Sequence, residues 1–311
     1  MRSTRMLAGT AAAALALTMA ACGDGGSEGS SGDGGSGGEG GGDTLSKIQD
    51  EGVITVGIAG EEPYSFKKDG ELTGATIAIH KKVFSELGVD EVEGVQTEWG
   101  SLIPGLNAGR FDIISAGMSI LPERCEQADF GHPEIMYTTA LMTPEGNPEG
   151  VNDMHDVADA DMKLAVMSGA IESGYADTLG IEKMEVGSPQ DGMDAVVQER
   201  ADAFALTGIS LRTMAENNPD APVEVTEPFT AIVDGKKQVG AGATVFRKDD
   251  DTLREAYNKE IDKIVGDEQA FTDVVGEFGF TDAERPKGEI TTEQLCAGEL
   301  PDAEQSEAVP D

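Results

Sequence analysis

The sequence predicts an α/β fold of two lobes, each of them a mainly parallel sheet flanked by helices. The strand-like run VITVGI (53–58) is followed by a helical pattern at 76–87, in which Ile79, Val83 and Leu87 recur at every fourth residue. Strands that alternate with helices in this way favour parallel sheets with helices on their faces. Residues 44–311 exceed the size of one small core and suit two lobes of ordinary size.

The remaining elements continue the alternation along the chain. Strands are expected within VEGVQTEW (92–99), FDIISAG (111–117), KLAVMSG (163–169) and ADAFALTG (201–208), and helices within SLIPGLNAGR (101–110), 172–179 and SPQDGMDAVVQER (188–200). In such sheets, ligands bind beyond the carboxyl ends of the strands. The loops after Ile58, Gly117, Met167 and Leu206 are therefore where we expect a site.

The first 43 residues predict export and anchoring by lipid. Arg2 and Arg5 precede an apolar run of the length of a signal peptide, which ends at MAAC (19–22), a sequence that looks like a bacterial lipobox. Residues 1–21 are thus expected to be a signal peptide and Cys22 the lipidated residue; the alternative is an ordinary signal site with an incidental Cys. Residues 23–43 are Gly, Ser and acidic, so 22–43 is expected to be a flexible tether.

The charge excludes several classes of partner. The chain has 59 acidic and 22 basic residues and a formal net charge of −37, which repels nucleic acid and anionic lipid. We expect membrane contact through the lipid anchor only, and we interpret most of the charge as a solvated acidic surface. No calcium-loop motif, Cys-x-x-Cys or His-x-x-x-His is present, so no metal site and no cofactor are expected.

Once Cys22 is assigned to lipid, Cys125 and Cys296 remain as an even pair in an oxidising compartment. We predict a disulfide between them; two free buried thiols are the alternative. A catalytic thiol is disfavoured because His80, His132 and His155 are scattered along the sequence.

Several blocks carry a resemblance to a known family. They are VGIAGEEPYSF (56–66), TEWGSLIPGLNAGRFDIISAGMSILPERC (97–125), DFGHPEIMYTTALM (129–142), GSPQDGMDAVVQERADAFALTGISL (187–211) and TTEQLCAG (291–298). The chain resembles the amino-acid-type (cluster F, type II) solute-binding proteins of ABC importers. Pro-Glu-Arg-Cys and Leu-Cys-Ala-Gly are similar to the ectoine/hydroxyectoine-binding branch.

The resemblance implies a type II periplasmic-binding-protein fold whose chain crosses twice between the lobes. It implies a first lobe of 44–141 plus 242–311 and a second of 142–241, with hinge strands near 140–143 and 239–243. Two short crossovers of this kind act as a hinge that closes on a ligand.

The resemblance also implies how a ligand carboxylate is bound. Arg124, just beyond the strand that ends near Gly117, matches the family Arg for this role, and a guanidinium can donate two parallel hydrogen bonds to a carboxylate. The alternative is a surface Arg paired with Glu123. Backbone N–H groups of Ser168, Gly169, Ala170 and Ile171 precede a predicted helix and could complete the carboxylate site, or they could serve only as a helix start.

Aromatic residues form only 5% of the chain, which makes Tyr64 and Trp99 conspicuous. Matching aromatics in the ectoine branch enclose a delocalised cationic ring. Glu61 matches the acid expected to accept hydrogen bonds from the ring N–H groups. The alternatives are a core Tyr, a core Trp and a solvated Glu.

Two positions depart from the pattern of the family. Ser119 stands where a third aromatic is expected, so the enclosure is either two-sided or completed by another residue such as Phe66, Tyr137 or Phe204. Thr207 stands where α-amino-acid binders usually place an Asp for the ligand ammonium. A buried ammonium without an acid is costly, which favours ectoine, a cyclic amidine without a primary ammonium.

Together these features predict a monomeric, membrane-tethered extracytoplasmic receptor. It would bind a small zwitterionic solute, ectoine or hydroxyectoine, and deliver it to an ABC permease whose ATPase is a separate chain, since no Gly-x-x-x-x-Gly-Lys-Ser/Thr loop occurs here. A receptor for another polar amino acid is the near alternative. A cyclohexadienyl-dehydratase-like enzyme with Glu61 as its acid, and an adhesin that binds no solute, are the more distant ones.

Overall fold

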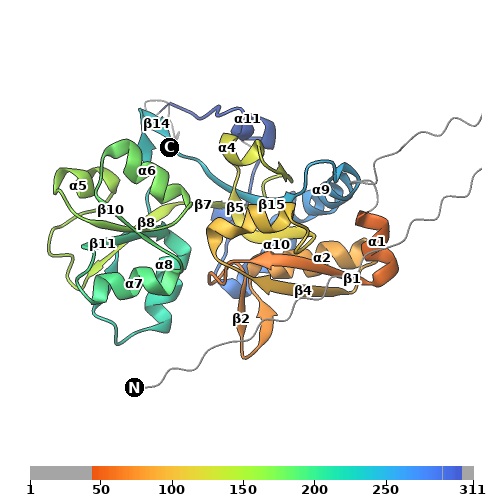
Figure 1. Cartoon of the computed structure of the whole chain (residues 1–311), viewed down its shortest axis with the longest axis horizontal. Helices are drawn as coiled ribbons and strands as arrows, with labels where there is room; N and C mark the ends of the chain where they lie inside the picture. The colour runs from red at the N-terminus through yellow and green to blue at the C-terminus, as the bar shows by residue number, and fades with distance from the viewer. Residues whose placement is uncertain (1–43, 289, 303–311) are drawn as a thin grey trace, which may run out of the picture. The chain divides into compact units, whose positions relative to one another are not determined.

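The computed structural model describes residues 44–288 and 290–302. The predicted signal peptide, Cys22 and the tether lie outside the described residues. Within the described part, strands and helices alternate as the sequence predicts, and the strands form two large sheets (Figure 1).

The first sheet combines parallel and antiparallel strands. Parallel pairing joins β4, β1 and β5, and β15 then runs antiparallel to β5, β6 and β7. Its strands, in order across the sheet, are β4 (Glu91–Gln96), β1 (Val53–Ile58), β5 (Ile113–Ser119), β15 (Gly240–Phe246) and β6 (Asp129–Phe130), with β7 (Ile135–Tyr137) also paired to β15.

The second sheet follows the same plan. Strands β10, β9 and β11 are parallel, and β8 runs antiparallel to β11 and β12. Its order is β10 (Lys183–Val186), β9 (Leu164–Met167), β11 (Ala203–Thr207), β8 (Thr139–Pro144) and β12 (Val223–Val225). Because β8 enters this sheet and β15 returns to the first, each sheet gains antiparallel strands that the helix–strand alternation alone does not predict.

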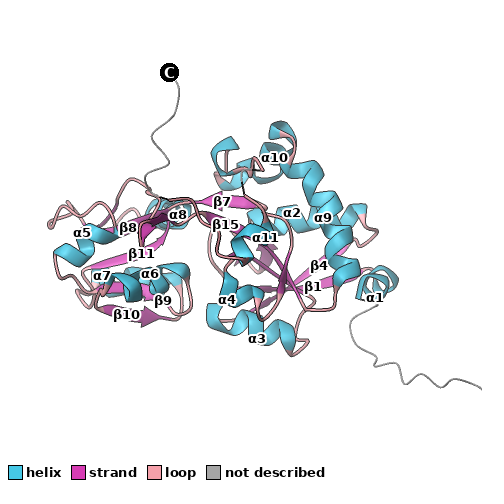
Figure 2. Cartoon of the chain, turned by 90° about the horizontal axis from the view of Figure 1, so that it is seen from above, coloured by secondary structure: helices cyan, strands magenta, loops and turns pink. Residues whose placement is uncertain are grey.

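Helices cover both faces of each sheet, and four apolar clusters fill the interfaces. On the first sheet, one face carries α1 (Thr44–Glu51), α2 (Ala75–Glu86), α9 (Asp251–Val265) and α10 (Glu268–Val275), and the other carries α3 (Leu102–Asn107), α4 (Pro122–Cys125) and α11 (Thr292–Cys296). Figure 2 shows α2, α9 and α10 together on one side of the strands, with α3 and α4 on the other.

On the second sheet, α5 (Met154–Asp159) and α6 (Ile171–Leu179) pack on one face, and α7 (Pro189–Val197) and α8 (Gly208–Asn217) on the other. Short elements complete the description: the ribbons β2 (Phe66–Lys68) with β3 (Glu71–Thr73) and β13 (Ile232–Val233) with β14 (Lys236–Lys237), and the 3₁₀ turns η1 (Trp99–Ser101), η2 (Gly276–Phe278) and η3 (Asp282–Glu284).

One predicted boundary differs in a way that affects the site. The sequence suggests a strand through Trp99, but β4 ends at Gln96, where its partner β1 also ends at Ile58. Without a strand to pair with, the chain turns, and Trp99 opens the 3₁₀ turn η1. Its indole is thereby free to leave the plane of the sheet.

A disulfide joins the end of α4 to the end of α11. The sulfurs of Cys125 and Cys296 are 1.98 Å apart, and 171 positions separate the two residues in the sequence. Together with the packing of Leu295 into the apolar cluster under α3, this bond fastens the C-terminal helix beside the segment that carries Arg124.

A buried polar network lies between the first sheet and helices α2 and α9. The ring of His80 contacts the hydroxyls of Ser115 and Thr244 at 2.7 and 2.6 Å, and Thr244 leads through Tyr257 to the carboxyl of Glu134. Burial lowers the pKa of His80 to about 3 and raises the pKa of Glu134 to about 7. His80 is therefore uncharged near neutral pH, and Glu134 is largely uncharged only below about pH 7.

Candidate functional site

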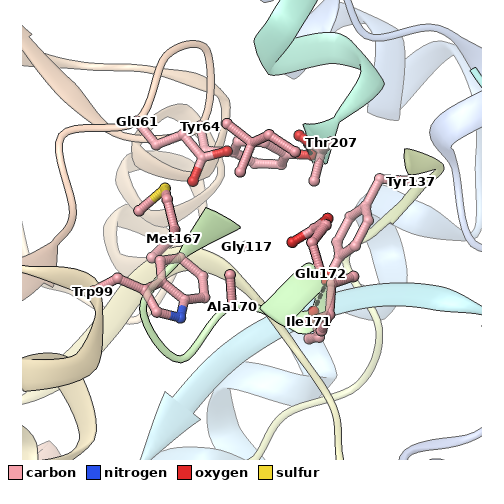
Figure 3. Close-up of a pocket in the computed structure, with 13 residues that line it drawn as sticks. Glu61, Tyr64, Trp99, Gly117, Tyr137, Met167, Ala170, Ile171, Glu172 and Thr207 are labelled. Atoms are coloured by element: carbon pink, nitrogen blue, oxygen red, sulfur yellow. Dashed lines mark hydrogen bonds between the residues drawn. The ribbon is translucent and has the colours of Figure 1, made fainter. Parts of the chain in front are cut away.

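The carboxyl ends of strands from both sheets meet around one cavity, whose space not filled by atoms, open solvent at its mouth included, is about 340 Å³. Eight of the predicted site residues line it: Glu61, Tyr64, Trp99, Gly117, Ser119, Ala170, Ile171 and Thr207. The other lining residues are Ala116, Tyr137, Met167, Glu172 and Leu206. Figure 3 shows the labelled side chains facing the shared space.

Three aromatic rings border the cavity. Tyr64 and Tyr137 meet edge to face, with ring centroids 6.2 Å apart, and Trp99 approaches from η1. Tyr137 is the one of the three proposed substitutes for the missing aromatic that lines the cavity, and its hydroxyl is hydrogen-bonded to Ser119. Phe66 lies on the β2–β3 ribbon, and Phe204 packs into the core against Gly192.

Gly117 explains how Tyr64 comes so close to β5. Its φ is +55°, and a Cβ atom built there would lie 2.7 Å from Cδ1 of Tyr64. An L-residue with a side chain is disfavoured in this backbone conformation and would push the ring away. The glycine thus leaves room for the Tyr64 ring to lie against β5 at the edge of the cavity.

Hydrogen bonds connect the loops of one sheet to those of the other. The Tyr64 hydroxyl donates to Oγ1 of Thr207 at 3.4 Å, Thr207 donates to Ser210 at 3.1 Å, and Ser210 donates to the Glu61 carboxyl at 2.6 Å. Glu61 and Tyr64 follow β1, whereas Thr207 and Ser210 lie at the start of α8. This chain of hydroxyls orients Glu61 across the cavity.

Arg124 lies beside the cavity rather than among the residues that line it. It is 7% exposed, and its guanidinium donates to the carbonyl oxygens of Ser119 at 3.0 Å and Gly169 at 2.7 Å. Its Cζ is 5.6 Å from the centre of the Trp99 ring, and the Trp99 indole N–H also donates to the Gly169 carbonyl, at 3.1 Å. Arg124 is therefore buried between the two sheets and is not paired with Glu123 in a surface ion pair.

Some of the N–H groups at the start of α6 already donate to backbone carbonyl oxygens. Helix α6 begins at Ile171, with Ala170 as its N-cap. The N–H of Ser168 donates to Val186 and that of Ala170 donates to Met167, so these two of the four predicted N–H donors already have acceptors.

Glu172 is the acidic residue that the sequence interpretation missed. It lies in the first turn of α6, is 1% exposed, and points its carboxyl group into the cavity (Figure 3). Its first-turn position alone suggests only a helix-stabilising acid on the surface. The signal that could have found it is its place five residues after the end of strand β9, at Met167, in the loop-and-helix region where a ligand was expected.

The electrostatics of the cavity are dominated by two buried acids. Burial raises the pKa of Glu61 to about 7, with partial compensation by the hydrogen bond from Ser210. The pKa of Glu172 is raised to about 8: burial is the main cause and the charge of Glu61 adds to it, whereas the backbone N–H of Glu172 and the charge of Arg124 act in the opposite direction. Desolvation lowers the pKa of Arg124, though not enough to neutralise a guanidinium.

This arrangement suits a small organic cation better than a metal. Aromatic faces attract cations, and carboxylates accept hydrogen bonds from cationic N–H groups. Within residues 44–288 and 290–302, no three His, Cys, Asp or Glu side chains come together in a group that could hold a metal ion.

Comparison with known proteins places the chain in a family. The model of the bacterial extracellular solute-binding proteins, family 3, matches residues 54–271. A probable amino-acid ABC transporter periplasmic-binding protein of Sinorhizobium fredii, y4tE, is 34% identical over 225 residues, which cover 70% of this chain and 74% of that protein.

Solved structures agree with this assignment. The crystal structure of EhuB in complex with hydroxyectoine superposes with a TM-score of 0.72 at 30% identity and covers 81% of this chain and 97% of EhuB. The ancestral amino acid-binding protein AncCDT-1, a precursor of cyclohexadienyl dehydratase, superposes with a TM-score of 0.66 at 26% identity and covers 76% of this chain and 99% of its own.

These relatives are solute-binding proteins and not enzymes, as the sequence predicts for this chain. Among the helices that the structure describes, none is both long and apolar enough to cross a membrane. The predicted two-lobe periplasmic-binding fold is confirmed by the family match and by the superposition on EhuB. The chain belongs to the bacterial extracellular solute-binding proteins, family 3, and is a substrate-binding protein of the amino-acid type of ABC transporter.

Proposed function

We propose that this protein captures ectoine or hydroxyectoine and delivers it to the permease of an ABC importer. The observation that carries the proposal is the convergence of three aromatic rings and two carboxyl groups on one cavity. Protonated ectoine has a flat, delocalised amidinium in a ring. Such a cation can stack against Tyr64, Trp99 and Tyr137 while its N–H groups donate to carboxylates. The similarity to EhuB supports the same ligand class.

The carboxylate of the ligand would bind at the Arg124 side of the cavity. Two of the guanidinium donors already bond to carbonyl oxygens, and an arginine has five N–H donors in all. The remaining guanidinium N–H groups, together with the backbone N–H groups of Gly169 and Ile171, can donate hydrogen bonds to the ligand carboxylate. The ligand can also replace the carbonyl oxygens that now accept from Arg124. Arg124 contacts the loops of both sheets, so a ligand bound there would favour their approach.

The cellular setting follows from the sequence. Cleavage before Cys22 and lipidation of that residue would leave the folded part tethered through residues 22–43 at the outer face of the cell membrane. The lobes 44–141 plus 242–311 and 142–241 would close on the solute as a monomer, and the closed form would be the one that the permease recognises. The ATP-hydrolysing subunit would be a separate chain.

Calorimetric titration tests the ligand. The purified protein, unfolded and refolded to remove carried-over solute, is titrated with ectoine, hydroxyectoine, glycine betaine, proline, glutamine and arginine. Tight, saturable binding of ectoine or hydroxyectoine supports the proposal. A response to glutamine or arginine without one to ectoine keeps the importer role and replaces the substrate.

One observation favours the second candidate, a receptor for a polar amino acid. Thr207 cannot neutralise an α-ammonium group, but Glu172 supplies an acid to the same cavity from another element. The sequence argument against common amino acids is thereby weakened. The relative y4tE carries the name of an amino-acid transporter component, which is consistent with this candidate.

A further inference from the structure

One carboxyl oxygen of Glu172 accepts no hydrogen bond from the described residues, although the side chain is buried at the cavity. Glu172 is 1% exposed, and its Oε1 atom has no hydrogen-bond partner among the described residues. Three other buried polar atoms share this state, on Ser65, Asp250 and Arg254, but Glu172 is the one of the four that lines the cavity. A buried acceptor without a donor is costly and therefore rare in folded proteins.

The charges around Glu172 do not balance. The titratable groups that face it are Glu61 from the loop after β1, Arg124 from α4, and Tyr64, Tyr137 and Tyr175. The tyrosines stay neutral because burial raises the pKa of each. Two carboxylates then face one guanidinium, which is already engaged with two carbonyl oxygens. The empty cavity therefore requires a proton or an added cation.

We propose that Glu172 is a specificity-determining residue that accepts a hydrogen bond from the cationic N–H group of the ligand, opposite Glu61. The ring amidinium of ectoine has two N–H groups that point away from each other, and the two carboxyl groups can accept a hydrogen bond from one each. The inference rests on the proposed function in that the cavity is the solute site. It holds for an ectoine-like solute and for an amino acid with an N–H cation, and it disfavours a quaternary ammonium, which has no N–H to donate.

Proton release follows from this arrangement. In the empty cavity Glu172 holds a proton near neutral pH, because its pKa lies at about 8. A ligand cation beside it favours the ionised form and lowers that pKa, so binding expels up to one proton. The affinity for the ligand should therefore rise with pH up to about pH 8 and then level off. A structural role of Glu172 at the start of α6 would not produce the part of this dependence between about pH 7 and pH 8, where Glu61 is already mostly ionised.

The test compares Glu172→Gln with the matched control Glu182→Gln. Glu182 is an exposed acid between α6 and β10, so the control removes the same charge outside the cavity. Wild type and both variants are titrated calorimetrically with ectoine and with arginine, from about pH 6 to about pH 8, in buffers of different ionisation enthalpy. We expect Glu172→Gln to bind about 10- to 100-fold more weakly at pH 8 and to lose the proton release at that pH, where Glu61, with a pKa of about 7, is already mostly ionised. The control should match the wild type in both respects.

Two outcomes separate this inference from the proposed function. If a solute binds and Glu172→Gln keeps the wild-type affinity and proton release, the inference is wrong and the importer role stands. If no solute of the panel binds the wild type, the proposed ligand class is wrong, and the inference is tested separately with acetamidinium chloride. The melting temperatures of the wild type and Glu172→Gln are then measured in acetamidinium chloride and in sodium chloride. Stabilisation of the wild type by acetamidinium that is absent in Glu172→Gln supports the inference, and equal shifts of the two melting temperatures overturn it.

Discussion

Replacement of Gly117 by alanine tests whether the Tyr64 ring is held against β5 as the structure shows. The new Cβ atom would lie 2.7 Å from Cδ1 and 3.0 Å from Cε1 of Tyr64, so the ring must move. That ring packs edge-on against Tyr137 and Phe280, with centroids 6.2 and 5.5 Å away. Movement of the ring would disturb both aromatic pairs and remove one face of the cavity.

The size of the effect can be separated into two parts. An alanine at φ +55° costs about 1 kcal/mol in backbone strain alone. Disturbing two aromatic pairs adds about 1–3 kcal/mol. We therefore expect Gly117→Ala to lower the free energy of unfolding by about 2–4 kcal/mol, and to weaken ligand binding about tenfold through the lost cation–π face.

Gly109→Ala is the matched control. Gly109 also has a positive φ, of +68°, but a Cβ atom there meets no other atom within 4 Å. Gly109→Ala should lower the free energy of unfolding only by the backbone strain, about 1 kcal/mol, and leave ligand binding unchanged. Urea unfolding and calorimetric titration of both variants provide the comparison. Equal stability losses in the two variants, with unaltered affinity in Gly117→Ala, would refute the role assigned to Gly117.

Three further predictions concern the ligand contacts, the disulfide and the buried network. By titration calorimetry, Arg124→Ala should reduce affinity at least about 100-fold because it removes two charge-assisted hydrogen bonds, and Trp99→Ala about tenfold; full affinity in both would mean that the ligand binds elsewhere. The Cys125→Ser/Cys296→Ser double variant should lose about 2–5 kcal/mol in urea unfolding, given the 171-position separation, and an unchanged midpoint would contradict this. The pKa of Glu134 is raised from 4.5 to about 7, so its contribution is complete below pH 4.5 and is lost as the pH rises to about 7. The stability of wild type relative to Glu134→Gln should fall by about 3 kcal/mol over that range in pH-dependent urea unfolding, and a flat difference would disprove it.

Most of the fold could be predicted because its signals are local in the sequence. The recurrence of Ile79, Val83 and Leu87 at every fourth residue reflects one helix face, and the run 53–58 reflects one strand that is covered on both sides. Strands β8 and β15 were expected as hinge strands from the resemblance to the family, but their antiparallel direction was not predicted, because it depends on where the chain enters and leaves each sheet. Nothing in their own residues records that path.

The candidate site was predictable only in part, for a related reason. Glu61, Tyr64 and Thr207 could be named because the resemblance to the family assigns a role to each position, and each lies at or after the end of a strand that the pattern identifies. The choice of Tyr137 over Phe66 and Phe204 depends on which side chains two different sheets bring together. The burial of a ligand-facing side chain is likewise a property of the assembled loops and not of its own segment.

The charge of a binding site is a sum over elements, and this limits any argument from a single position. Thr207 removes the acid that amino-acid binders place there, and taken alone it argues against an ammonium ligand. Glu172 returns an acid to the same cavity from the first turn of α6. A zwitterion brings one cation and one anion to the site, so its binding can release the proton of one glutamate, which we expect to be Glu172. A solute with a net positive charge also favours ionisation of Glu61, so the number of protons released on binding reports the charge class of the ligand.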